Sequence, residues 1–299
     1  MTILDIVALA HAIMLVVGVC ISSRIVSHTS FLVHARKDPA RTTFRYLKFA
    51  FATFSAYALF FIVFAGVGTA QFYMYKNSDN IRDSPYYNLY KAFGSCSKIG
   101  ELMTVICELS IDTLIAFILP RLFTATLNAH SGSSELTGKI IGVAFRVIVF
   151  VLVALNSVIL ALELLNIFSM FFAPDDIPIS FFLSFVLLEI RFAFKHVIVV
   201  TSLAVAAGTV VVKTQTGADK SLAWASTMLV TASVVWFLHA CMVSGWIQFA
   251  DDLYVYSFQF TFGIWLQFVI LIMVYIMLDK ANGIWSGQQE PLTQAKKAK

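Results

Sequence analysis

Charged residues are scarce in this chain. Only 13% of its 299 residues are Asp, Glu, Lys or Arg, whereas 59% are hydrophobic and the mean hydropathy is +0.83. Soluble domains carry about twice this share of charge, and one core of this size cannot bury so much apolar surface. The composition therefore excludes a disordered chain and a typical soluble enzyme. It predicts an all-α protein that lies in the lipid bilayer.

Motifs for cofactors, metals and nucleic acids are also missing. The four cysteines form no CxxC pair or other metal-binding spacing, which excludes a disulfide scaffold and a zinc site. No GxxxxGK(S/T) or GxGxxG loop, GxSxG elbow or HExxH pair occurs, and Asp251 and Asp252 lack the further acid of a DDxxD site. We therefore expect no cofactor and no metal. The net charge of +4 is small and the basic residues flank apolar stretches, so we expect no nucleic-acid partner.

Seven apolar stretches are long enough to cross a bilayer as helices, since a span needs about 20 residues. The fifth carries charges in its middle, and we interpret it as one tilted or kinked helix, because its first half alone is too short to span. The predicted spans are Ile3–Val26, Phe49–Tyr73, Ile99–Leu119, Ile140–Phe171, Ile179–Val212, Leu222–Phe249 and Leu253–Leu278. They give a seven-helix transmembrane domain over residues 1–279 and a short basic tail over 280–299.

Basic residues between the spans predict the orientation of the bundle. Fourteen Lys and Arg residues fall in the connections and the tail on one side, against four on the other, and cytosolic loops carry the excess of positive charge. The N-terminus is therefore predicted to be lumenal or outside, and the C-terminus cytosolic. On the lumenal side, Tyr86, Tyr90 and Phe93 recur at helical spacing, which indicates an amphipathic helix lying at the membrane interface.

The chain ends in a lysine-rich segment that contains Lys296 and Lys297. Lysines at the third and fourth positions from the end of a cytosolic tail resemble the dilysine signal that returns membrane proteins to the endoplasmic reticulum. Such a signal is read by a receptor and is not an anchor. This predicts residence in the endoplasmic reticulum and recognition of the two lysines by coat protein. A basic tail without a targeting role is the alternative.

Ionisable residues inside the predicted spans are costly in lipid, so each is a candidate for function. In the third span, Glu108 and Asp112 lie four residues apart on one helix face, which must point into the bundle. Further ionisable residues fall in the fourth and fifth spans. The candidate catalytic residues are Glu108, Asp112, Glu163, Glu189, Arg191 and His196.

These residues include four deep carboxylates, against three deep bases, Arg146, Arg191 and Lys195. All of the bases could form pairs between helices, and Arg191 is the expected partner of Glu108 or Glu189. The count leaves one carboxylate over, and an unpaired carboxylate in a low dielectric keeps its proton because burial disfavours the charged form. Such a group is a general acid near neutral pH.

Glu108 or Glu189 is the expected proton donor of such a site. Arg191, Asp112 or His196 would then tune the donor or relay protons. Glu163 would receive the proton at the end. The sequence does not tell which carboxylate is the acid and which are only ion-paired.

Aromatic residues are abundant, with 28 Phe, 10 Tyr and 5 Trp. Some could line a pocket for a lipophilic ligand and stabilise a developing cation with their ring faces. With seven helices, almost no soluble part, intramembrane acids and these aromatics, the chain resembles the integral-membrane terpene cyclases of fungal meroterpenoid pathways. The resemblance implies an enzyme that protonates an epoxide or olefin of a prenylated, lipophilic substrate. Ring closure through a carbocation would follow, without a metal or a nucleotide.

Two other functions remain open beside the enzyme. Seven helices with an outside N-terminus suit a receptor or sensor, but the third span ends without an E/DRY motif and the seventh lacks NPxxY. The acidic stripe of the third span could instead relay protons in a proton-coupled transporter.

Overall fold

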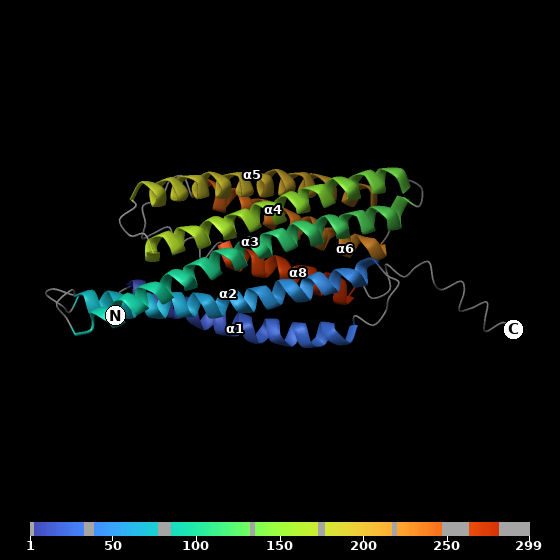
Figure 1. The fold of residues 1–299 in the computed structure, drawn as a ribbon. Helices are drawn as coiled ribbons and strands as arrows, with labels where there is room; N and C mark the ends of the chain where they lie inside the picture. Colours follow the sequence, from blue (N-terminus) through green and yellow to red (C-terminus); the bar gives the residue numbers. More distant parts are fainter. Residues whose placement is uncertain are drawn as a thin grey trace.

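A computed structural model of the chain is a bundle of α-helices (Figure 1). The structure describes residues 3–32, 39–76, 85–131, 135–172, 177–216, 220–246 and 263–280. The helices in this part of the chain are α1 (Ile3–Leu32), α2 (Pro39–Lys76), α3 (Tyr87–Ser131), α4 (Glu135–Phe172), α5 (Ile177–Thr216), α6 (Lys220–Trp246) and α8 (Trp265–Lys280). The all-helical prediction is confirmed. The tail with Lys296 and Lys297 lies outside the described residues.

Six of these helices, α1 to α6, are long and apolar enough to cross a membrane. The last, α8, contributes a shorter apolar helix, Trp265–Leu278. This confirms the prediction of a multi-pass membrane protein. The seventh predicted span began at Leu253 and is described only from residue 263. The fifth predicted span is one continuous helix of 40 residues, as expected.

The long helices follow from the composition of the chain. Lipid offers no hydrogen bonds to the backbone, so an apolar segment satisfies its own N–H and C=O groups as a helix. Among the described residues, prolines, which have no N–H to donate, stand mostly at or just before the start of a helix, and Pro120 lies within α3. Pro39 opens α2, and Pro178 lies in the first turn of α5, where that N–H has no helical partner.

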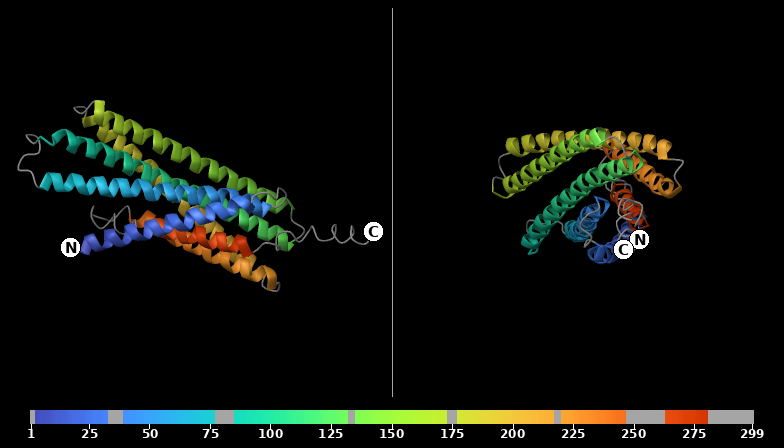
Figure 2. Two further views of the ribbon diagram at one scale, coloured as in Figure 1. Left: turned by 90° about the horizontal axis from the view of Figure 1, so that it is seen from below. Right: turned by 90° about the vertical axis from the view of Figure 1, so that its right-hand side faces the viewer.

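The central helix of the bundle is α3. It packs against α2, α4, α5, α6 and α8, and 67% of its apolar window is buried. In Figure 1, α1 and α2 lie at one edge, α4 and α5 at the other, and α6 and α8 lie behind α3. The helices run up and down, so that the start of α1 and the end of α8 lie at opposite ends of the bundle (Figure 2). Polar residues on α3 therefore face several neighbours at once.

Small residues bring α2 and α3 together over a long contact. A Cβ atom on Gly100 would lie 3.1 Å from the backbone N and Cα of Phe64, and one on Gly94 would lie 2.8 Å from Nε2 of Gln71. Small residues at such crossings allow membrane helices to approach closely. This contact holds the segment around Tyr90 as the first turns of the 45-residue helix α3. The expected separate helix at the interface is therefore wrong.

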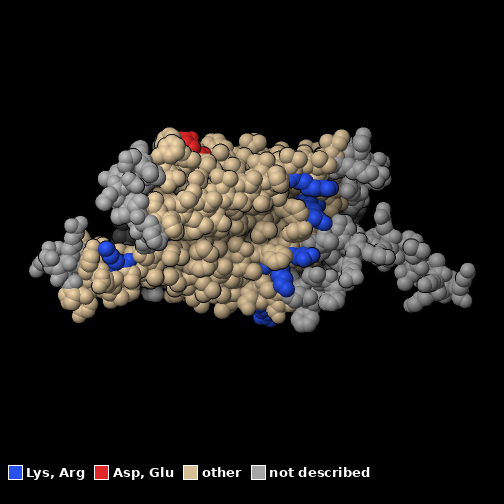
Figure 3. Space-filling view, viewed as in Figure 1, with Lys and Arg blue, Asp and Glu red and all other residues tan. Residues whose placement is uncertain are grey.

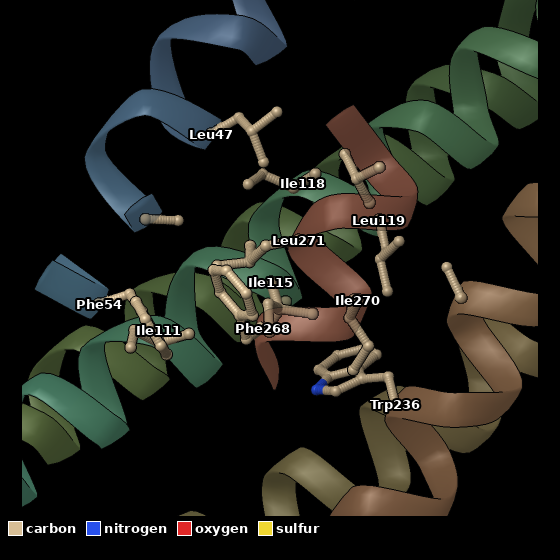
Figure 4. Packing of buried hydrophobic residues seen from close by; sticks show 14 of the residues in the cluster. Leu47, Phe54, Ile111, Ile115, Ile118, Leu119, Trp236, Phe268, Ile270 and Leu271 are labelled. Carbon is tan, nitrogen blue, oxygen red and sulfur yellow. The ribbon is translucent and has the colours of Figure 1, made fainter. Parts of the chain in front are cut away.

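Large apolar side chains fill the space between α2, α3, α6 and α8. Figure 4 shows Phe54 of α2, Ile111 and Ile115 of α3, and Phe268 of α8 converging on one another, with Trp236 of α6 below them. Phe54 and Phe268 stack with ring centroids 4.4 Å apart. Each of these side chains is at most 5% exposed. This packing fixes the neighbours of α3 and thereby positions the polar residues on its inner face.

The outer surface is largely uncharged. Figure 3 shows Lys and Arg side chains toward the ends of the bundle, with a broad band between them that holds no Lys or Arg and only one small acidic patch, toward one end. Large apolar side chains such as Phe150 of α4 and Val200 of α5 are 74% and 68% exposed on this surface. Such a band matches the hydrocarbon core of a bilayer. All four cysteines are free, so a bridge between Cys96 and Cys241, which the sequence left open, does not form.

Candidate functional site

The inner face of α3 carries two buried acids, Glu108 and Asp112. They lie one helical turn apart, so their side chains point in the same direction. Glu108 is 7% exposed and Asp112 is fully buried. The sequence predicted that this face is turned into the bundle, and the structure confirms it.

Three further polar side chains reach these acids from three other helices. Nζ of Lys195, on α5, donates to Oε1 of Glu108 at 3.1 Å and to Oδ2 of Asp112 at 3.4 Å. Nε2 of His239, on α6, lies 3.2 Å from Oδ1 of Asp112. Nε2 of Gln267, on α8, donates to the same oxygen at 2.7 Å. We call Glu108, Asp112, Lys195, His239 and Gln267 the central cluster.

The charges of the central cluster do not balance without an extra proton. Two carboxylates face one lysine, so the cluster carries one negative charge when both acids are ionised and His239 is neutral. A net charge is costly in a buried site of low dielectric. One proton, on His239 or on a carboxylate, removes it. The cluster therefore has room for one exchangeable proton.

The cluster lies well inside the uncharged band. Along α3, this band is bounded by Glu101 and Arg121, which are separated by about 30 Å of helix. Asp112 lies near the middle of this interval, and Glu108 lies about 10 Å from Glu101 along the helix axis. Since a bilayer core is about 30 Å thick, the cluster falls between one boundary and the midplane of a membrane fitted to this band.

A second ion pair lies one turn away on α5. Arg191 pairs with Glu163 of α4, and both side chains are only partly exposed, 33% and 13%. The expected pairing of Arg191 with Glu108 or Glu189 is therefore wrong. Because Lys195 occupies the face of α5 that meets α3, Glu108 takes Lys195 as its partner, and Arg191 pairs with α4 instead.

Two candidate residues of α5 lie apart from the cluster. Glu189 and His196 are both exposed, seven residues apart on the outer face of this helix. Nδ1 of His196 lies 2.8 Å from the backbone carbonyl oxygen of Phe192, and the His196 ring stacks on the Phe192 ring. Arg146, in the first half of α4, is exposed as well. The structure thus brings together Glu108 and Asp112, pairs Glu163 with Arg191 beside them, and leaves Glu189 and His196 outside.

An aromatic group lies next to the cluster, between α1, α2 and α8. Tyr57 of α2 is buried and close enough to Glu108 for electrostatic interaction. Trp265 donates from Nε1 to Nδ1 of His11 at 3.2 Å, which ties α8 to α1. Phe61 completes this group with an edge contact to His11, centroids 5.0 Å apart. The rings pack against one another on one side of the buried acids.

The sequence did not single out two members of the cluster, His239 and Gln267. Each is a strongly polar residue within an apolar helix, which is a signal that can be recognised in a sequence. However, spacing along α6 or α8 does not tell which residue of a distant helix such a side chain will meet. Oε1 of Gln267 is buried and has no hydrogen-bond partner among the described residues. A water molecule or a ligand donor is the usual partner of such an atom.

Comparisons with known proteins give no relative from which a function could be transferred. The chain matches no family model, no curated protein and no solved structure. Within the described residues, no group of three or more His, Cys, Asp or Glu side chains is arranged to hold a metal ion. The function must therefore be inferred from the central cluster itself.

Proposed function

We propose that the protein is a proton-coupled membrane transporter whose central cluster is the proton-binding centre. One observation carries this proposal: the buried carboxylates of Glu108 and Asp112 share a single lysine, Lys195, inside the apolar band. Ionisable groups at such a depth commonly mark ion or proton pathways. Because one proton would neutralise the net negative charge of these two acids and Lys195, a proton can bind and leave there.

The cluster also connects protonation to helix packing. Asp112 of α3 contacts Lys195 of α5, His239 of α6 and Gln267 of α8, so four helices meet at one carboxylate. A proton on Asp112 weakens its attraction to Lys195 and to a positively charged His239. The relative stability of two helix arrangements then depends on this proton. A coupled transporter requires such a dependence.

Infrared difference spectroscopy tests the proton-binding centre directly. A protonated carboxylic acid has a C=O stretch that the ionised form lacks, and we expect this band to appear as the pH falls. Asp112→Asn or Glu108→Gln should remove or shift it. Glu101→Gln is the matched control on α3, because Glu101 pairs with Lys98 on the surface, away from the cluster. An unchanged band in both cluster variants would overturn the proposal.

Proteoliposomes test the transport step. Vesicles loaded with a pH-sensitive dye and given a potassium diffusion potential should change their internal pH faster with the wild-type protein than with Asp112→Asn. The Glu101→Gln protein should behave as the wild type. If wild-type vesicles and protein-free vesicles responded at the same rate, the transporter assignment would lose its basis.

A membrane enzyme is the second candidate, and the aromatic group supports it. Tyr57 lies close to Glu108, and Phe268 follows Gln267 directly in α8. An acid with aromatic side chains on one side suits the protonation of a prenylated, lipophilic substrate and the stabilisation of a carbocation. In this function Glu108 or Asp112 gives the proton. Glu163 and Arg191, one turn from Lys195, tune the donor.

Microsomes provide the test of the enzyme. They are incubated with epoxidised prenylated substrates, and cyclised products are identified by mass spectrometry. We expect Glu108→Gln to abolish product formation and Glu101→Gln to retain it. Equal turnover by the two variants would eliminate this function.

The orientation and the location of the protein belong to the same proposal. Arg24 and Arg121 lie in the second halves of α1 and α3, and Lys48 and Arg146 in the first halves of α2 and α4. These helix ends lie at the end of the bundle at which α8 ends (Figure 1), and we propose that this end is cytosolic. The tail would then present Lys296 and Lys297 to coat protein and keep the protein in the endoplasmic reticulum. A protein tagged at the N-terminus should localise there and escape when both lysines are changed to alanine. Identical localisation of the two proteins would disprove the retrieval signal.

A further inference from the structure

The most exposed helix of the bundle, α4, carries three polar residues on the inner face of its second half. Only 11% of its apolar window is buried. Its inward side chains recur at helical spacing, and two of them, Leu152 and Ile159, are fully buried apolar residues. Ile141, Phe145, Ile148 and Leu155 also pack against the core, and the polar residues on this face are Asn156, Glu163 and Asn166, all partly buried. Because so little of α4 is buried, polar side chains on its inner face add little to its packing on the bundle. Their presence therefore calls for another explanation.

Three polar atoms along this face are buried without a partner. They are Oδ1 of Asn156, Oδ1 of Asn166 and Nε of Arg191, and none of them forms a hydrogen bond with a described residue. Buried polar atoms are nearly always bonded to protein or to ordered water. Two acceptors and one donor, spread along the side of α4 that faces α3 and α5, are therefore the expected lining of a hydrated path.

The polar face leads to the depth of the central cluster. From Asn166, the pair of Glu163 and Arg191 lies about one turn further along α4, and Lys195 follows Arg191 by about 6 Å along α5. Asn156 lies about 10 Å deeper than Glu163 and donates to Oγ of Ser110 at 3.2 Å. Ser110 stands between Glu108 and Asp112 in α3, about half a turn round the helix from both, so this end of the polar face is level with the cluster but on the side of α3 that meets α4.

We infer that the inner face of α4 forms a water-filled path that brings protons to the central cluster. Water enters near Asn166, passes the pair of Glu163 and Arg191, and reaches Lys195 and Glu108. Asn156 and Ser110 form the inner end of the path. Protons move along hydrogen-bonded water, and the path opens at the end of the bundle where α4 ends and α5 begins. This inference rests on the proposed proton-binding function of the cluster.

Accessibility of substituted cysteines tests the path. In a protein whose four native cysteines are changed to alanine, Asn166→Cys and Asn156→Cys are treated with a charged thiol reagent that does not cross membranes. Leu165→Cys and Val158→Cys are the matched controls, because Leu165 and Val158 are 55% and 44% exposed on the outer face of α4. We expect the two asparagine positions to react at least about tenfold faster than their controls, since the reactive thiolate forms only in contact with water.

Each outcome of this experiment supports or overturns the path. Equal rates at Asn166→Cys and Leu165→Cys would overturn it. So would reaction at Asn166→Cys without reaction at the inner end, because the water would then stop short of the cluster. If Asn156→Cys does not elute as a folded protein, Ser110→Cys reports on the same depth with almost no change in side-chain volume.

The failure of the path and the failure of the proposed function give different results. If the inner cysteines react but both Asp112→Asn and Glu108→Gln leave the infrared carboxyl band unchanged, the hydrated path stands and the proton-binding centre is wrong. If the carboxyl band disappears in Asp112→Asn but the cysteines do not react, the centre stands and the path along α4 is wrong.

Discussion

Nε2 of Gln267 lies 2.7 Å from Oδ1 of Asp112, although the two residues are 155 positions apart in the chain. This bond joins α8, the shortest described helix, to α3 at the centre of the bundle. The same amide nitrogen lies 3.5 Å from the backbone oxygen of Glu108. One neutral side chain therefore fixes the register of α8 against both acidic residues.

Replacing Gln267 by leucine should destabilise the bundle. Hydrogen bonds to a charged group contribute about 1.5–3 kcal/mol, and the leucine leaves Asp112 with fewer donors. We expect a lower midpoint of thermal unfolding in mild detergent. Gln267→Glu adds a third carboxylate, so its midpoint of thermal unfolding should be lower still at neutral pH. The midpoint should rise again in part in acid, where a carboxylate can be protonated. A midpoint unchanged in both variants would show that the bond contributes nothing.

Replacing Lys195 by methionine should lower the stability of the bundle more than the Gln267 variants do. It leaves Glu108 and Asp112 buried without their cation, and breaking a buried ion pair in this way costs about 3–5 kcal/mol. Lys98→Met is the control, because Lys98 and Glu101 form an exposed pair worth at most about 1 kcal/mol. Thermal unfolding in detergent compares the two variants.

A compensated variant separates charge from packing in this result. When Lys195→Met is combined with Glu108→Gln and Asp112→Asn, no charge remains to be paired, and much of the lost stability should return. If the triple variant unfolds as early as Lys195→Met alone, the lysine acts through its volume and the electrostatic account is wrong.

Gly100 gives a prediction for the contact between α2 and α3. Leucine at this position meets the backbone of Phe64, so the two helices must separate, and such overpacking costs about 1–3 kcal/mol or more. A Cβ atom on Gly66 meets nothing within 4 Å, which makes Gly66→Leu the control. We expect a reduced yield of folded protein on size-exclusion chromatography for Gly100→Leu only. Equal yields would mean that close approach at Gly100 is not needed.

Trp265→Phe tests the attachment of α1. The phenyl ring can keep the contacts with Phe54 and Phe268 but cannot donate to Nδ1 of His11. We expect faster hydrogen–deuterium exchange in peptides of α1 and unchanged exchange in α4. Exchange that is unaltered in α1 would show that apolar packing alone holds this helix.

The helices could be predicted from the sequence because their cause is local. A long apolar stretch must form a helix in lipid, and this sets the number and the approximate limits of the spans. The inward direction of Glu108 and Asp112 could be predicted in the same way, because residues four positions apart share one face of a helix. The predicted depth of Arg191 was also sufficient to expect an ion pair.

The partners of these residues could not be predicted, because they depend on how each helix is rotated about its axis. Arg191 and Lys195 lie at similar depths, and sequence spacing does not tell which of them faces α3. In the structure Lys195 forms an ion pair with Glu108, and Arg191 forms one with Glu163. Glu189, at nearly the same depth, lies on the outer face of α5 instead.

The length of α3 has a mechanical consequence. Its 45 residues rise about 67 Å, more than twice the thickness of a bilayer core. About 21 Å of this helix, from Tyr87 to Glu101, extends beyond the uncharged band and is supported by α2 through Gly94. A reporter group attached near Tyr87 would therefore lie about 20 Å along the helix from the boundary that Glu101 marks.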